Sequence, residues 1–197
     1  MNRAKIEALS RRYQMVLYDV DRTLVGFDSL DPLPNVAFCI EALNRLNVKQ
    51  VAVTNQGGPA CRDNGFKGEY PTVEQVRRRI DTIVYHLGLQ RAYICWAYLT
   101  KDLVFYWPAS YSIPESADPD WQDQQAAWRK PYPGMLRQAA LDFKVMPQSI
   151  LMVGDGKQDQ EAAKAFGCDF MWAWSFFDWP QPVAENERPT AKPDLSF

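Results

Sequence analysis

The feature of this sequence that most constrains its fold is an apolar run that ends in two acidic residues. Residues 15–18 are apolar, with β-branched and aromatic members, and they predict a short buried strand. Asp19 follows directly, and Asp21 and Thr23 come after it at alternate positions. Because desolvating an unpaired carboxylate is unfavourable, a buried strand rarely ends in two acids. The pattern therefore predicts a site in which a cation holds both carboxylates, and the alternative is an acidic turn at the surface.

Strands and helices alternate along the rest of the chain. Further strands are predicted at residues 48–53, 92–97, 149–153 and 170–174, and segments with apolar residues at helical spacing lie between them. This alternation predicts an α/β fold, with a Rossmann-like parallel sheet sandwiched by helices and connected by right-handed crossovers. In such sheets, ligands bind at the carboxyl ends of the strands.

Unusual polar residues stand at three of these strand ends. They are Asp19 with Asp21, Thr54 with Asn55, and Asp155 with Asp159. Because the carboxyl ends of parallel strands share one edge of the sheet, we expect the three pairs to converge on one place. Periodicity alone therefore predicts a functional site at this edge.

The clearest helix in the sequence covers residues 72–87. Thr72 and Gln75 are typical of a capping box, and the apolar residues that follow share one face. The three arginines at 77–79 begin on the other side and are interpreted as a solvated face, with a contact to a phosphate backbone as the alternative. His86 is the one histidine of the sequence and stands at the end of this helix, so histidine-based catalysis has little to work with.

The composition is typical of a globular protein with one domain. The chain has 197 residues and a net charge of −2, so it has no general electrostatic attraction to nucleic acid or to an anionic membrane. No apolar run approaches the ~20 residues of a membrane span, and the N-terminus lacks the apolar core of a signal peptide. The cysteines form no CxxC pair and predict reduced thiols; they are Cys39, Cys61, Cys95 and Cys168. We therefore expect a cytoplasmic protein with no membrane association.

Residues 1–180 are predicted to form the domain, with an aromatic loop inserted at about residues 100–128. This loop is too long for an ordinary connection, and we expect it to cover part of the body. Its aromatic side chains suit stacking on a base or a sugar, and the alternative is that they pack the loop onto the domain. They are Tyr106, Trp107, Tyr111, Trp121 and Trp128. Residues 181–197 are polar, rich in proline and interpreted as a tail.

The clustered acids indicate metal-dependent chemistry on a phosphate group. Oxygen ligands without cysteine or histidine suit Mg²⁺. A Mg²⁺ held by carboxylates, with a lysine, a threonine and backbone amides nearby, suits a phosphate ligand. One carboxylate in line with phosphorus would act as nucleophile, and a second carboxylic acid would protonate the leaving oxygen. The residues therefore indicate phosphoryl transfer.

Four short segments resemble, in order, the four motifs of the haloacid dehalogenase (HAD) superfamily. They are Asp19-Val-Asp21-Arg-Thr23, Thr54-Asn55, Lys130-Pro131 and Gly154-Asp155-(x)3-Asp159, and the resemblance covers roughly residues 13–175. Within the superfamily, Thr54-Asn55-Gln56-x-Gly58 and the segment from Arg129 to Met135 resemble the histidinol-phosphate and heptose-bisphosphate phosphatase branch. The polynucleotide 3′-phosphatases are close relatives of that branch.

The resemblance implies how the acidic motifs would work. Asp19 would be the nucleophile and a Mg²⁺ ligand, and Asp21 would be the general acid/base and bind the metal through its backbone carbonyl. Asp155 would be the remaining metal ligand, and Asp159 and Thr23 would support the site. The strand that carries Asp19 would be central, between the strands that end in Asp155 and in Thr54.

The other motifs would bind the substrate phosphate. Thr54 and the amide of Asn55 would hold the phosphoryl oxygens, and Lys130 would offset the charge of Asp19 and of the phosphate. Arg129 would be an extra contact to the substrate. Arg22 stands where the family most often has glycine; it would either brace the loop, reach the substrate or lie at the surface.

The resemblance favours a Mg²⁺-dependent phosphomonoester hydrolase that acts through an aspartyl-phosphate. The spacing between motifs leaves no room for a large cap domain, and the cysteine–histidine loop of some relatives is missing, so we expect no structural zinc. The expected substrate is a small sugar or metabolite phosphate. The alternatives are a nucleic-acid 3′-phosphate, as in a polynucleotide 3′-phosphatase, and a catalytically silent binding protein.

Overall fold

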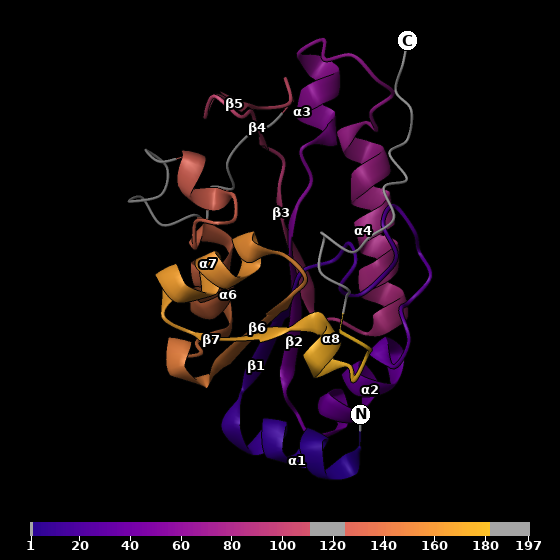
Figure 1. The fold of residues 1–197 in the computed structure, drawn as a ribbon, viewed down its shortest axis with the longest axis vertical. Coiled ribbons are helices and arrows are strands. Elements are labelled where there is room, and N and C mark those ends of the chain that lie inside the picture. Colours follow the sequence, from indigo (N-terminus) through magenta and orange to yellow (C-terminus); the bar gives the residue numbers. More distant parts are fainter. Residues whose placement is uncertain (1, 111–124, 182–197) are drawn as a thin grey trace.

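The computed structural model describes residues 2–110 and 125–181, which form a parallel sheet with helices on both faces (Figure 1). The sheet has five strands in the order β3-β2-β1-β6-β7, and all neighbouring strands are parallel. Its strands are β1 (Met15–Tyr18), β2 (Lys49–Asn55), β3 (Arg91–Cys95), β6 (Ile150–Gly154) and β7 (Asp169–Trp172). The predicted α/β fold is therefore confirmed, and β1 lies between β6 and β2 as the resemblance implied.

Two layers of helices cover the sheet. The first layer contains α1 (Arg3–Arg12), α2 (Val36–Arg45), α4 (Val73–Leu87) and the short α8 (Ala173–Phe176). The second contains α6 (Gly134–Phe143) and α7 (Lys157–Phe166). In Figure 1, α4 lies to the right of the strands, and α6 and α7 lie to the left.

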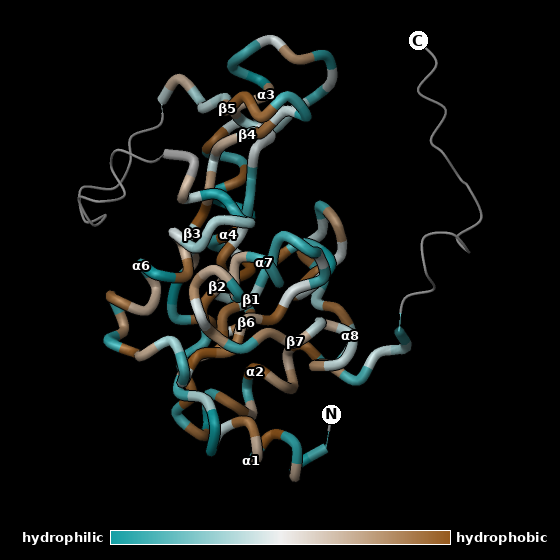
Figure 2. Tube along the Cα trace, turned by 60° about the vertical axis from the view of Figure 1, so that its left-hand side comes forward, coloured by the Kyte–Doolittle hydropathy of each residue, from teal (hydrophilic) through white to brown (hydrophobic). Residues whose placement is uncertain are grey.

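Residue alternation along the central strand divides the buried residues into two cores. Val16 and Tyr18 belong to the core beneath α2 and α4, whereas Met15 and Leu17 belong to the core beneath α6 and α7. All four side chains have no exposed surface, as expected for a strand covered on both faces. Figure 2 shows hydrophobic segments gathered where β1, β2 and β6 run.

The strand register brings the predicted polar pairs to one edge. Tyr18 lies level with Ala52 of β2 and with Val153 of β6, so the residues that follow these strands emerge side by side. In the described part of the chain, no large cap domain covers this edge. Residues 98–106 form a separate two-stranded sheet of β4 (Tyr98–Leu99) and β5 (Phe105–Tyr106).

The structure contains elements and boundaries that the sequence analysis did not predict. The segment after Gly57 forms a short helix, α3 (Gly58–Asp63), which has Pro59 in its first turn. Strand β7 ends at Trp172, because the chain turns there into α8. Part of the aromatic loop is also regular, as β4, β5 and the 3₁₀ helix η1 (Gln125–Trp128), and another 3₁₀ helix, η2 (Pro147–Ser149), precedes β6.

Some predictions fall outside the described residues. Tyr111 and Trp121 of the aromatic loop lie there, as does the tail from residue 182. Trp128 lies within the described chain and is buried against α6 and β3, donating a hydrogen bond from Nε1 to the carbonyl of Ile94 (3.2 Å). This side chain packs the loop end onto the body. Within residues 2–110 and 125–181, no helix combines the length and apolar character needed to cross a membrane.

The capping box at the start of α4 gives a prediction for stability. Thr72 accepts a hydrogen bond from the Gln75 amide (3.1 Å), and the Gln75 side chain accepts one from the Thr72 amide (2.8 Å). We expect Thr72→Ala to lower the free energy of unfolding by about 1 kcal/mol, because the Gln75 amide loses its hydrogen-bond acceptor and the capping box is broken. Urea denaturation measures this change. Thr82→Ala, at a partly buried position inside the same helix where the hydroxyl donates only to the Arg78 carbonyl (2.8 Å), is the matched control and should change stability by less than about 0.5 kcal/mol; equal losses would contradict the capping account.

Candidate active site

A buried lysine joins two acidic residues at the carboxyl edge of the sheet. Lys130 Nζ lies 2.6 Å from Asp19 Oδ1 and 2.7 Å from Asp159 Oδ1, and it donates a hydrogen bond to the carbonyl of Val53 (2.8 Å). The Lys130 and Asp159 side chains have no exposed surface, and that of Asp19 is 9% exposed. The ammonium group donates hydrogen bonds to Asp19 and to the Val53 carbonyl, and its contact with Asp159 is an ion pair.

Asn55 fixes the backbone that carries this lysine. Its side-chain oxygen accepts a hydrogen bond from the Lys130 amide (3.1 Å), and its side-chain nitrogen donates one to the Lys130 carbonyl (3.0 Å). Asn55 ends β2, whereas Lys130 follows η1, so this pair ties the sheet to a distant segment. The sequence analysis assigned Asn55 a backbone contact and missed this use of its side chain.

Asp159 is held at the start of α7. Its Oδ2 accepts a hydrogen bond from the amide of Gly156 (3.0 Å), which leaves Oδ1 for Lys130. A Cβ atom on Gly154 would lie 2.5 Å from Cβ of Asp159, so only glycine allows the helix to approach β6 this closely. Asp159, which was predicted to support the site, therefore contacts Lys130 directly.

The charges of this cluster fit a divalent cation. Carboxylate oxygens of Asp19, Asp155 and Asp159 lie within 4.8 Å of one another; the Lys130 ammonium group pairs with Asp19 and Asp159, and the charge of Arg22 acts on Asp155. Burial raises the pKa of Asp19 to about 7, an effect that Lys130 offsets in part. Burial and the nearby Asp159 also raise the pKa of Asp155. An excess of negative charge on oxygen ligands is the environment that Mg²⁺ prefers.

Asp21 is held by two side chains that the sequence analysis did not assign to the site. Arg79 Nη2 lies 2.5 Å from Asp21 Oδ1, and Gln56 Nε2 donates a hydrogen bond to Asp21 Oδ2 (2.9 Å) and another to Thr54 Oγ1 (3.0 Å). The interpretation of residues 77–79 as a solvated face is therefore wrong for Arg79, whose side chain is 14% exposed. The interpretation holds for Arg78, whose side chain is 76% exposed and pairs with Glu74.

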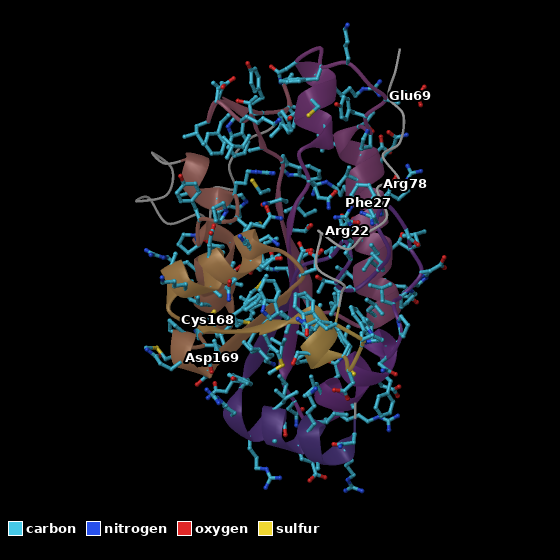
Figure 3. All side chains as sticks on the ribbon, viewed as in Figure 1. Arg22, Phe27, Glu69, Arg78, Cys168 and Asp169 are labelled. Atoms are coloured by element: carbon cyan, nitrogen blue, oxygen red, sulfur yellow. The ribbon has the colours of Figure 1, made fainter. Side chains whose placement is uncertain are left out.

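A pocket of about 260 Å³ brings most of the predicted residues together. Asp19, Asp21, Thr54, Asn55 and Asp155 all line it. Arg22 lines it as well, and its guanidinium group lies 5.0 Å from the ring centre of Phe27. Figure 3 labels these two side chains beside α4. Arg22 has φ = 63°, a left-handed conformation that favours glycine.

Lys130 and Asp159 do not line this pocket but lie against Asp19, whereas Thr23 and Arg129 lie apart from it. The Thr23 hydroxyl is fully buried and has no hydrogen-bond partner in the described part of the protein. The Arg129 guanidinium group donates a hydrogen bond to the carbonyl of Ala97 (2.6 Å) and is largely buried, which lowers its pKa. It does not line the pocket, so its contact with substrate stays a prediction.

The raised pKa of Asp19 predicts how stability changes with pH in metal-free protein. Between its ordinary pKa of 3.8 and about 7, the folded protein binds more protons than the unfolded chain, so the Asp19 contribution falls as pH rises. An asparagine side chain does not titrate, so we expect Asp19→Asn to gain stability relative to the wild type between pH 5 and pH 8, by roughly 1–3 kcal/mol. Urea denaturation in EDTA at both pH values measures this gain. A stability difference that is equal at pH 5 and pH 8 would contradict the prediction.

Comparisons with known proteins agree with this geometry. The model of the HAD-hydrolase-like family matches residues 127–175. The chain is 27% identical over 155 residues to the D-glycero-β-D-manno-heptose-1,7-bisphosphate 7-phosphatase of Pseudomonas putida, covering 78% of this chain and 73% of that protein. It is 30% identical over 141 residues to the D-glycero-D-manno-heptose-1,7-bisphosphate 7-phosphatase of Thermosynechococcus vestitus, covering 72% of this chain and 65% of that protein.

A solved structure supports the fold. The D,D-heptose 1,7-bisphosphate phosphatase of B. bronchiseptica, complexed with magnesium and phosphate, superposes with a TM-score of 0.55 at 22% identity, covering 79% of this chain and 78% of that one. The family match, the two relatives and the sheet order agree with the four motifs read from the sequence. The chain is therefore similar to hydrolases of the HAD superfamily, and the two relatives described above are phosphatases.

Proposed function

We propose that this protein is a Mg²⁺-dependent phosphomonoesterase that acts on a small sugar or metabolite phosphate through an aspartyl-phosphate on Asp19. The observation that carries the proposal is the buried contact of Lys130 with Asp19 and Asp159, beside a pocket lined by Asp21 and Asp155. A buried lysine that neutralises one carboxylate oxygen leaves the other for attack on phosphorus. The same lysine offsets the negative charge that a phosphate brings into the pocket.

The two carboxylates at the end of β1 have different roles in this reaction. Asp19 attacks phosphorus as the bond to the leaving oxygen breaks, and Asp21 gives its proton to that oxygen. Asp21 then takes a proton from the water that attacks the aspartyl-phosphate, and free phosphate is released. Arg79 and Gln56 are positioning residues, because they fix the direction of the Asp21 carboxylate.

The other residues of the pocket bind the phosphoryl group and the cation. The Thr54 hydroxyl and the Asn55 amide would donate hydrogen bonds to phosphoryl oxygens. Asp19, Asp155 and the Asp21 carbonyl would hold Mg²⁺, which supplies positive charge against the phosphate oxygens. Asp159 would keep Lys130 and the neighbouring acids in place, as its two contacts suggest.

A sugar phosphate is favoured as substrate over a nucleic-acid end. The two relatives described above are named for a phosphorylated sugar, and the net charge of −2 offers no general attraction to a polyanion. Of the loop's described aromatic side chains, Trp128 is buried and not available for stacking on a base, whereas Tyr106 and Trp107 are partly exposed.

The nucleophile can be tested by substitution. Asp19→Asn should lower kcat for Mg²⁺-dependent hydrolysis of 4-nitrophenyl phosphate by at least about a thousandfold, because an amide oxygen is a poor nucleophile. Phosphate release with and without EDTA measures the effect. Asp81→Asn, on the exposed surface of α4, is the control and should retain activity. Turnover that survives Asp19→Asn would rule out the assignment of this residue.

Arg79 gives an independent test of the Asp21 assignment. Arg79→Met should lower kcat by about 10- to 100-fold with little change in KM, because the acid/base loses its orientation. Arg79→Lys should recover part of kcat, and Arg78→Met, one residue away and exposed, should behave as the wild type. A rise in KM at constant kcat would show instead that Arg79 binds substrate.

A further inference from the structure

The pocket beside Asp19 has a cation on its wall that the reaction described above does not use. Among the described residues that line this pocket of about 260 Å³, Arg22 alone is positively charged. Lys130 is buried against Asp19 and does not line the pocket. The charge of Arg79 is paired with Asp21. A phosphate that enters the pocket would therefore meet unshared positive charge at Arg22.

The guanidinium group of Arg22 has hydrogen-bond donors available for an anion. Within residues 2–110 and 125–181, no carboxylate forms a salt bridge with it. The group lies over the ring of Phe27, 5.0 Å from the ring centre, and Phe27 is 71% exposed and lines the same pocket (Figure 3). A guanidinium group on an aromatic face keeps the N–H groups at its edge available. The ring thus supports the charge at the pocket wall without using its donors.

The backbone of Arg22 adopts a conformation that an arginine rarely takes. Its φ of 63° lies in the left-handed region, which is unfavourable for long side chains and costs glycine nothing. The Arg22 amide donates a hydrogen bond to the carbonyl of Val25 (2.8 Å), so the turn after Asp21 holds this conformation. Unfavourable backbone conformations persist at sites where the side chain has a function. Because this side chain also lines the pocket, the geometry indicates a function in the pocket.

We propose that Arg22 is a further substrate-binding residue and contacts the phosphoryl group from the exposed side of the pocket. The inference rests on the proposed function, which assigns this pocket to a phosphate. Guanidinium N–H groups form paired, charge-assisted hydrogen bonds with phosphate oxygens. Lys130 offsets negative charge where Asp19 attacks, and Arg22 does so at the exposed side of the same group. Arg22 therefore strengthens the binding of substrate and of released phosphate alike.

The experiment compares Arg22→Gly with Lys144→Gly, a matched control. Lys144 is exposed at the end of α6 and also has a left-handed φ, of 55°. Each substitution removes one positive charge and one unfavourable φ, so both should raise the midpoint of urea denaturation. Isothermal titration calorimetry with inorganic phosphate, at a Mg²⁺ concentration that saturates each variant, measures the contact. We expect affinity to fall about tenfold in Arg22→Gly and to stay unchanged in Lys144→Gly.

Two further substitutions separate the charge of Arg22 from its backbone. Asparagine tolerates the left-handed region and is neutral, so Arg22→Asn should lose phosphate affinity as Arg22→Gly does. Arg22→Lys keeps the charge and should recover part of the affinity. The KM for 4-nitrophenyl phosphate should rise by the same factor as the dissociation constant for phosphate, with kcat nearly constant, because substrate and transition state lose the same contact.

The outcomes separate this inference from the proposed function. Unchanged phosphate affinity in Arg22→Gly, or an equal loss in Lys144→Gly, would overturn the contact and keep the phosphatase. A loss confined to substrates with a second anionic group, at constant KM for 4-nitrophenyl phosphate, would also overturn it and place Arg22 against the leaving group. A wild type that binds phosphate through Arg22 and hydrolyses no phosphate ester would overturn the proposed function and keep the contact.

Discussion

The site depends on one buried positive charge, the ammonium group of Lys130. A charged group without exposed surface is strongly destabilising unless it is paired and hydrogen-bonded, and here ion pairs with Asp19 and Asp159 and a hydrogen bond to the Val53 carbonyl meet that need. Each partner comes from a different part of the chain, at the end of β1, in α7 and in β2. The lysine therefore fixes the relative positions of three elements, and the Asp19 carboxylate is held in place only when the sheet and α7 have formed.

The sequence predicts this arrangement well because the signals are local. The apolar run at residues 15–18 and the acids after it identify β1 and its end, and the parallel register then brings Thr54 and Asp155 to the same edge. The capping box at Thr72 and Gln75 marks the start of α4 within one residue. Such features are decided by residues a few positions apart, so pattern and spacing are sufficient.

The contacts around Asp21 were not predictable in the same way. Arg79 lies 58 positions from Asp21 and belongs to a run of three arginines that look alike in the sequence. Only the packing of α4 against α2 and the sheet decides which of them turns inward, and Arg79 does so while Arg78 stays exposed. The two hydrogen bonds between the Asn55 side chain and the Lys130 backbone were not predictable for the same reason, since the two residues lie 75 positions apart. Long-range polar contacts of this kind leave no periodic signal.

The account of the reaction rests on a covalent phosphate on Asp19. The most direct measurement is to quench a reaction at steady state, reduce the trapped acyl phosphate with borohydride and map the modified peptide by mass spectrometry. An aspartyl-phosphate is reduced to homoserine, so we predict homoserine at position 19 in protein quenched with Mg²⁺ and 4-nitrophenyl phosphate, and aspartate there when substrate is left out. Homoserine at another acid, or unmodified Asp19 in protein shown to be turning over, would contradict the central claim.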